Sequence, residues 1–95
     1  MPKLNPLFHE PARLAILSAL APAEYVEFAM LLHLTGVSKS ALSKHLSALA
    51  GAGVVDVSQG PNDRRERRIA LTEPGRAAFD SYLLYLERIV QNARR

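Results

Sequence analysis

The stretch GVSKSALSKHLSALAGAGVVDV, from Gly36 to Val57, decides the fold because it combines a helix, a helix stop and a strand. Its leucines recur at three- and four-residue spacing, on one side of a helix, at Leu42, Leu46 and Leu49. Gly51 ends this helix, and the valines that follow it are typical of a strand. The other side of the helix carries small polar and basic residues, which form either the solvated face of an ordinary surface helix or a face that fits a negatively charged partner.

A second helix is predicted immediately before this one. Phe28, Leu31 and Leu32 form the buried side of a short helix that precedes the segment TGVS. Gly36 suits the left-handed residue that ends a helix, and Ser38 suits the N-cap of the next. Two helices over about residues 27–50, joined by so tight a turn, indicate a helix-turn-helix.

A basic β-hairpin is predicted after the helix pair. Residues Val54–Ser58 read as a strand, and Gln59–Asp63 are rich in turn formers. The stretch Arg64–Thr72 begins charged and ends as a second strand, with Ile69 and Leu71 on one side. The hairpin, over about residues 54–71, suits the wing of a winged helix-turn-helix.

The two remaining helices flank this unit. The first covers about Glu10–Leu20, and Tyr25–Val26 follows it as a short extended piece. The last covers about Glu73–Ala93 with Thr72 as N-cap, and at 1.5 Å per residue it is roughly 30 Å long. We therefore predict a mainly α fold with a small β-hairpin, that is, a winged helix-turn-helix with a long C-terminal helix.

The long helix carries an apolar stripe that is too long for one small domain to cover. It could fold back wholly onto its own domain, but its length and breadth favour a homodimer, with this helix (about residues 73–93) joining the subunits. The predicted dimer residues are Phe79, Tyr82, Leu83, Leu86, Ile89 and Val90.

Length and composition set the broad class. The 95 residues suit one domain, residues 1–95, and nearly half of them are apolar. The sequence has no cysteine, which excludes disulfides and thiolate metal sites. It has neither an apolar run long enough to span a bilayer nor an apolar signal peptide. We expect a cytoplasmic protein that needs no membrane, cofactor or metal.

The positive charge is concentrated in the middle of the chain. The net charge is only +3, and an equal excess lies between Ser38 and Arg68. Such an uneven charge distribution gives information about binding partners rather than about the fold. The second helix of a helix-turn-helix enters the DNA major groove, and a wing makes a second contact. Double-stranded DNA is therefore the expected partner. The predicted contacts are Ser38, Lys39, Ser40, Ser43, Lys44 and Ser47 on the helix, and Arg64, Arg65 and Arg67 on the wing.

Three segments together resemble small winged-helix transcriptional regulators. They are HEPARLAILSAL (9–20), TGVSKSALSKHLSALAGAGVV (35–55) and RRIALTEPGRAAFDSYLLYL (67–86). The resemblance is to compact MarR-like proteins, with kinship to the ArsR group, and it covers nearly the whole chain. It implies a homodimer that represses transcription from a palindromic operator. Without cysteine, the chain departs from metal-sensing ArsR members, and it is shorter than typical ligand-sensing MarR proteins. Any effector is left open.

The sequence offers two alternatives to DNA binding. The same fold can serve as a protein-interaction module that never binds DNA, and the absence of salt-sensitive duplex binding would identify it. Ser43, His45 and Asp56 suggest a catalytic triad on paper, but the sequence has no nucleophile elbow and no oxyanion hole. His45 lies at the border of the leucine stripe, where a packing role is the simpler interpretation, and a metal site from His9 and His33 is not expected.

Overall fold

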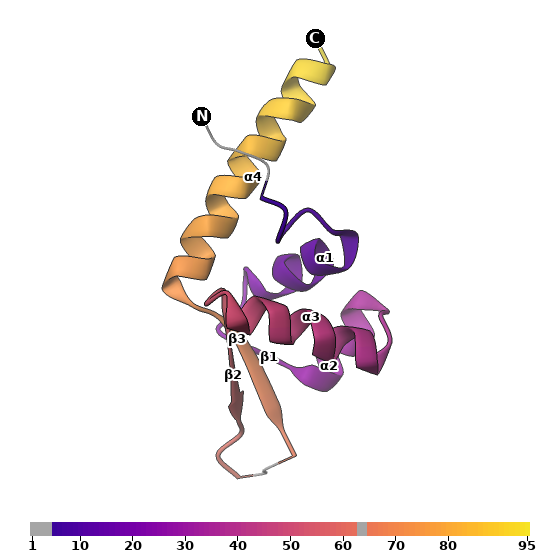
Figure 1. The fold of residues 1–95 in the computed structure, drawn as a ribbon, viewed down its shortest axis with the longest axis vertical. Helices are drawn as coiled ribbons and strands as arrows, with labels where there is room; N and C mark the ends of the chain where they lie inside the picture. The colour runs from indigo at the N-terminus through magenta and orange to yellow at the C-terminus, as the bar shows by residue number, and fades with distance from the viewer. Residues whose placement is uncertain (1–4, 63–64) are drawn as a thin grey trace.

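The computed structural model describes residues 5–62 and 65–95 of the chain. Four helices and a three-stranded sheet follow the predicted order (Figure 1). Their bounds are α1 Pro11–Leu20, β1 Val26–Glu27, α2 Phe28–Thr35, α3 Lys39–Gly51, β2 Val55–Gln59, β3 Arg67–Leu71 and α4 Glu73–Ala93. The winged helix-turn-helix fold predicted from the sequence is confirmed.

The helix ends form as their residues predict. Ser38 Oγ accepts a 3.1 Å hydrogen bond from the amide of Ala41 and caps α3. Thr72 Oγ1 accepts a 2.9 Å hydrogen bond from the amide of Gly75 and caps α4. Gly36 has a φ of 71°, a left-handed conformation that glycine adopts without strain, and it ends α2.

The sheet is antiparallel with the order β1-β3-β2. Val57 pairs with Ile69 and Gln59 pairs with Arg67, so these residues share one face of the hairpin. The second strand expected within the stretch Arg64–Thr72 is β3, which begins at Arg67 because the ladder stops at the Gln59–Arg67 pair. Beyond it, the amide of Gly60 donates to the carbonyl of Glu66 and closes the loop.

The core lies where α1, α2, α3, α4 and the sheet meet. The leucine stripe of α3 is buried as predicted, at Leu42, Leu46 and Leu49. Phe8, which no pattern in the sequence indicated, is fully buried and packs edge-on against Phe79 and Tyr82, with ring centres 6.0 and 5.5 Å away. The segment before α1 therefore fills the space between α1 and α4.

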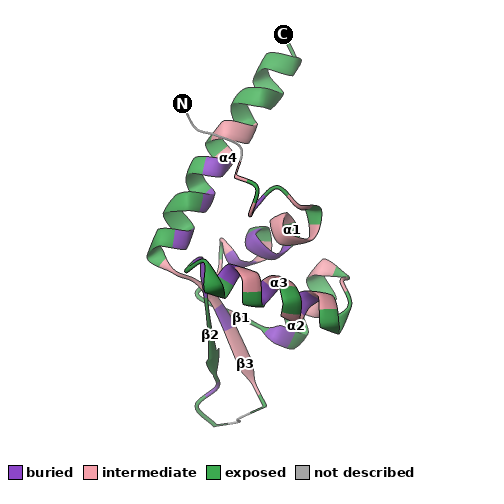
Figure 2. Cartoon of the chain, viewed as in Figure 1, coloured by how far each residue is buried: buried purple, intermediate pink, exposed green. Residues whose placement is uncertain are grey.

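The chain is elongated because α4 and the hairpin extend in opposite directions from the three-helix body (Figure 1). The Cα positions span 51 × 25 × 21 Å. Figure 2 shows that the C-terminal half of α4 is mostly exposed, and every residue from 87 to 95 is. The far end of α4 is therefore not covered by the described part of its own chain, as its length led us to expect.

Candidate nucleic-acid interface

The outer side of α3 presents a small, polar and basic surface. Lys39, Ser40, Lys44 and Ser47 are exposed, and Ser43 is half-buried. Because the leucines anchor the opposite side in the core, this face is held outward by packing rather than by its own polarity. Short side chains let a helix approach the floor of a DNA groove, and lysine reaches phosphates or base edges. The structure thus brings together the residues predicted on this helix.

The hairpin divides its arginines between its two faces. Arg67 shares a face with Ile69 and Val57, toward the helices, and its guanidinium carbon lies 3.9 Å from the centre of the Phe28 ring. Arg65 is exposed in the loop. Arg64, the remaining predicted wing contact, lies outside the described residues.

Arg68 lies on the other face of the hairpin and is tied to its own protomer. Its Nε donates a 2.8 Å hydrogen bond to Glu66, and its guanidinium stacks on the Tyr25 ring at 4.4 Å. The hydrogen bond to Glu66 raises the pKa of Arg68. The alternation of faces along a strand could have distinguished Arg67 from Arg68 in the sequence, but the cation–π partners could not have been found.

A polar cluster joins α3 to α1. Arg13 Nε donates a 3.2 Å hydrogen bond to His45 Nδ1, and Glu10 Oε2 lies 3.3 Å from the same nitrogen. Arg13 also donates to the carbonyl of Leu7 at 3.2 Å. His45 therefore lies at the boundary of the core, as interpreted from the sequence, and not on the outward face of α3.

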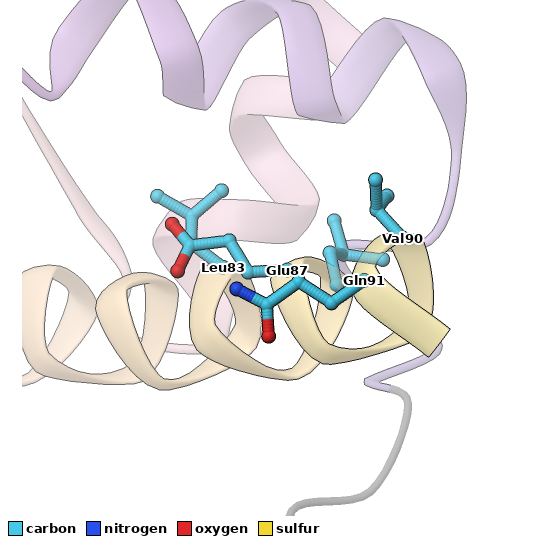
Figure 3. Close-up of a pocket in the computed structure, with 5 residues that line it drawn as sticks. Leu83, Glu87, Val90 and Gln91 are labelled. Carbon is cyan, nitrogen blue, oxygen red and sulfur yellow. The ribbon is translucent and has the colours of Figure 1, made fainter. Parts of the chain in front are cut away.

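The predicted dimer residues on α4 fall into two groups. Phe79 and Tyr82 are 1% and 3% exposed, because both pack inside the protomer against Phe8. This differs from their predicted place in a subunit interface. Leu83, Leu86, Glu87, Val90 and Gln91 line an open hollow of about 380 Å³ on the far half of the helix (Figure 3). Ile89 and Val90 are 46% and 48% exposed.

No helix of the described residues is both long and apolar enough to cross a membrane. Within the same residues, no group of three or more His, Asp and Glu side chains gathers as it would around a metal ion.

Comparison with known proteins gives the family. The sequence-family model of the winged helix DNA-binding domain matches residues 12–90. Among solved structures, a transcriptional regulator homologue from Pyrococcus horikoshii superposes with a TM-score of 0.86 and 21% identity. The match covers 92% of this chain and 87% of that one, and it shows the shared fold. No curated protein matches the sequence.

Two further structures hold DNA. A mutant MarR from E. coli, complexed with operator DNA, has a TM-score of 0.77 and 27% identity over 94% of this chain. The transcriptional repressor CouR, bound to a 23-mer duplex, has a TM-score of 0.74 and 26% identity over 81%. The present chain covers only 64% and 54% of those two proteins. The family is one of DNA-binding domains and not of enzymes. By the match over residues 12–90 and by its architecture, the chain belongs to the winged helix DNA-binding domain family and is a MarR-like member of it.

Proposed function

We propose that this protein represses transcription by binding a palindromic operator in double-stranded DNA as a homodimer. The observation that carries the proposal is the outer face of α3, where Lys39, Ser40, Lys44 and Ser47 are exposed. A major groove accepts an α-helix, and this one offers hydroxyls and ammonium groups along its accessible side. Ser38, whose side chain caps the helix, lies at the same end as Lys39.

The wing adds a second contact surface in this proposal. Arg65 and Arg67 lie on the hairpin that extends beyond the three-helix body (Figure 1). Phosphate contacts from such cations supply affinity, whereas base contacts from α3 supply sequence preference. The two structural relatives that hold DNA support the use of this fold for DNA binding.

The homodimer would be formed by α4. A second copy would cover the apolar surface on its far half, which consists of the exposed Ile89 and Val90 and the partly buried Leu83 and Leu86. Phe79 and Tyr82 would support this surface from inside each protomer. A two-fold pair places two α3 helices about one DNA turn apart, which matches a palindromic site.

The proposal is tested by selecting bound duplexes from genomic fragments and measuring their affinity against salt concentration. Each lost phosphate contact lowers the slope of log affinity against log salt by about 0.9. Lys39→Ala with Lys44→Ala is expected to lower both affinity and slope. The control is Arg88→Ala, because Arg88 is an exposed cation on α4, at the end of the molecule away from the wing.

Two results would contradict the proposal. If no duplex is selected at any salt concentration, the fold serves another purpose here, such as docking a protein. If the double lysine variant and the Arg88 variant behave alike, α3 is not the DNA-facing helix. Placing the selected site over a promoter and measuring transcription with and without the protein tests repression.

A further inference from the structure

A notch separates α3 from the hairpin on the outer side of the molecule. It has a volume of about 280 Å³, and its lining residues lie on α3, β2 and β3. We call it the α3–sheet notch, and it is lined by Ser43, Leu46, Ser47, Ala50, Val57 and Arg67.

The walls of the α3–sheet notch differ in chemistry. Ser43, Ser47 and Arg67 supply two hydroxyls and one cation. Ala50 and Val57 supply an apolar wall that the protomer leaves open. Val57 is 45% exposed although its cross-strand partner, Ile69, is fully buried. A site for an apolar ligand would not need the cation, and a site for a free ion would not need the exposed valine.

Arg67 is held at the notch without being neutralised. Its guanidinium lies against the Phe28 ring, a contact that orients the group while keeping its charge. Among the residues that the structure describes, no ion pair involves Arg67. Its neighbour Arg68 is bonded to Glu66 on the other face of the sheet. Arg67 is therefore a hairpin cation that is oriented toward α3 and still able to bind an anion.

The geometry of duplex DNA indicates which anion would bind in the α3–sheet notch. The major and minor grooves are separated by one sugar–phosphate strand. If α3 enters the major groove and the hairpin lies over the adjacent minor groove, that strand must cross the boundary between α3 and the hairpin. The α3–sheet notch is this boundary.

We propose that the α3–sheet notch seats this one sugar–phosphate strand, which rests on the proposed function. A phosphate binds Arg67 and the hydroxyls of Ser43 and Ser47, while the deoxyribose packs against Val57 and Ala50. Arginine and serine are common phosphate ligands, and the sugar is the apolar part of the backbone. Arg67 thereby acts at the base of the wing rather than at its tip. Phe28 becomes a positioning residue that holds the guanidinium in place.

The test compares two arginines that differ by one position. Arg67→Met keeps an unbranched side chain against Phe28 and removes the charge, and Arg68→Met is its matched control on the opposite face. On a duplex selected with the unaltered protein, Arg67→Met is expected to weaken binding about tenfold or more. It should also lower the salt slope by about 0.9 per protomer. Arg68→Met should leave the affinity and the salt slope unchanged within experimental error. Circular dichroism at the binding temperature checks that each variant is folded.

A second measurement locates the phosphate. Methylphosphonate replacements neutralise single phosphates of the same duplex, one at a time. One position in each half-site should weaken binding of the unaltered protein and have no effect on Arg67→Met. Val57→Glu, which places a negative charge on the sugar wall, should weaken binding more than Ser58→Glu on the other face.

The outcomes separate this inference from the function on which it rests. If the unaltered protein selects no duplex, the proposed function fails. If it binds a duplex but Arg67→Met has the same salt slope as the unaltered protein, the proposed DNA binding is supported. The proposal that the α3–sheet notch binds a sugar–phosphate strand is then wrong. The same holds if no single phosphate shows the coupling to Arg67.

Discussion

Arg13 Nε donates a 3.2 Å hydrogen bond to His45 Nδ1, and this bond joins α1 to the helix that carries the serine–lysine face. The same Nδ1 also faces the carboxylate of Glu10. Glu10 Oε2, 3.3 Å away, is buried and has no hydrogen-bond partner among the described residues. Arg13 Nε, at 3.8 Å, is the cation beside this carboxylate.

Arg13→Met should therefore destabilise the fold. It removes the donors to His45 and to the carbonyl of Leu7, and it leaves the buried Oε2 atom of Glu10 without the arginine beside it. We expect the free energy of unfolding in urea to fall by about 1–3 kcal/mol. Lys39→Met, at an exposed cation on α3, should change it by less than about 0.5 kcal/mol. Equal unfolding midpoints for the two variants would show that the cluster contributes nothing.

Replacing the two helical glycines, Gly51 and Gly75, with alanine should change the free energy of unfolding in opposite directions. Alanine normally stabilises a helix by up to about 1 kcal/mol relative to glycine. Gly51 has open space where a Cβ would lie, so Gly51→Ala should follow that rule. At Gly75 a Cβ would collide with the backbone carbonyl of Val54. Gly75→Ala should lower the free energy of unfolding by about 1–3 kcal/mol, since backbone has to move. Thermal unfolding of both variants provides the test, and stabilisation at position 75 would refute the close packing.

Tyr82 predicts how stability changes at alkaline pH. Burial, with a smaller effect of Tyr85, raises the pKa of Tyr82 above its ordinary value. An unfolded tyrosine ionises near pH 10 and the folded Tyr82 only at higher pH, so the unfolded state releases the proton first. This contribution to stability is complete below pH 10 and is lost as pH rises through the folded pKa.

Tyr82→Phe should flatten this alkaline decline. The variant also loses the 2.9 Å hydrogen bond to His9 Nδ1, so at pH 7 we expect a cost of about 1 kcal/mol. Urea unfolding at pH 7 and at several values above 10 gives both quantities. The difference between the two proteins should shrink as pH rises, and curves that stay parallel would contradict the assignment.

The proposed dimer makes a prediction about mass. Light scattering should give about twice the chain mass of 10.4 kDa. Leu86→Glu places a charge in the hollow on α4 and should halve that mass. Ser81→Glu adds the same charge on an exposed part of the same helix, about 140° around its axis, and should leave the dimer intact. A monomer at micromolar concentration for the unaltered protein would remove the dimer from the proposal and leave the DNA face untouched.

Local chemistry in the sequence was enough for the elements and their order. The leucine spacing of α3, the caps at Ser38 and Thr72 and the left-handed turn at Gly36 each act within a few residues, so a linear pattern reveals them. The outward face of α3 follows from the same spacing, because burying the leucines turns the serines and lysines away. The residue at which β3 begins, Arg67, was not predicted, since a charged run carries no signal for where a ladder starts.

Only the tertiary structure decided which side chains meet across the chain. Phe8 reaches Phe79 and Tyr82 over about seventy residues of sequence, and so two residues assigned to a subunit interface lie in the core. Arg67 and Arg68 are adjacent and alike in sequence, yet one stacks on Phe28 beside α3 and the other is bonded to Glu66. Such contacts depend on how separate elements pack against each other, and periodicity within one element does not contain that information.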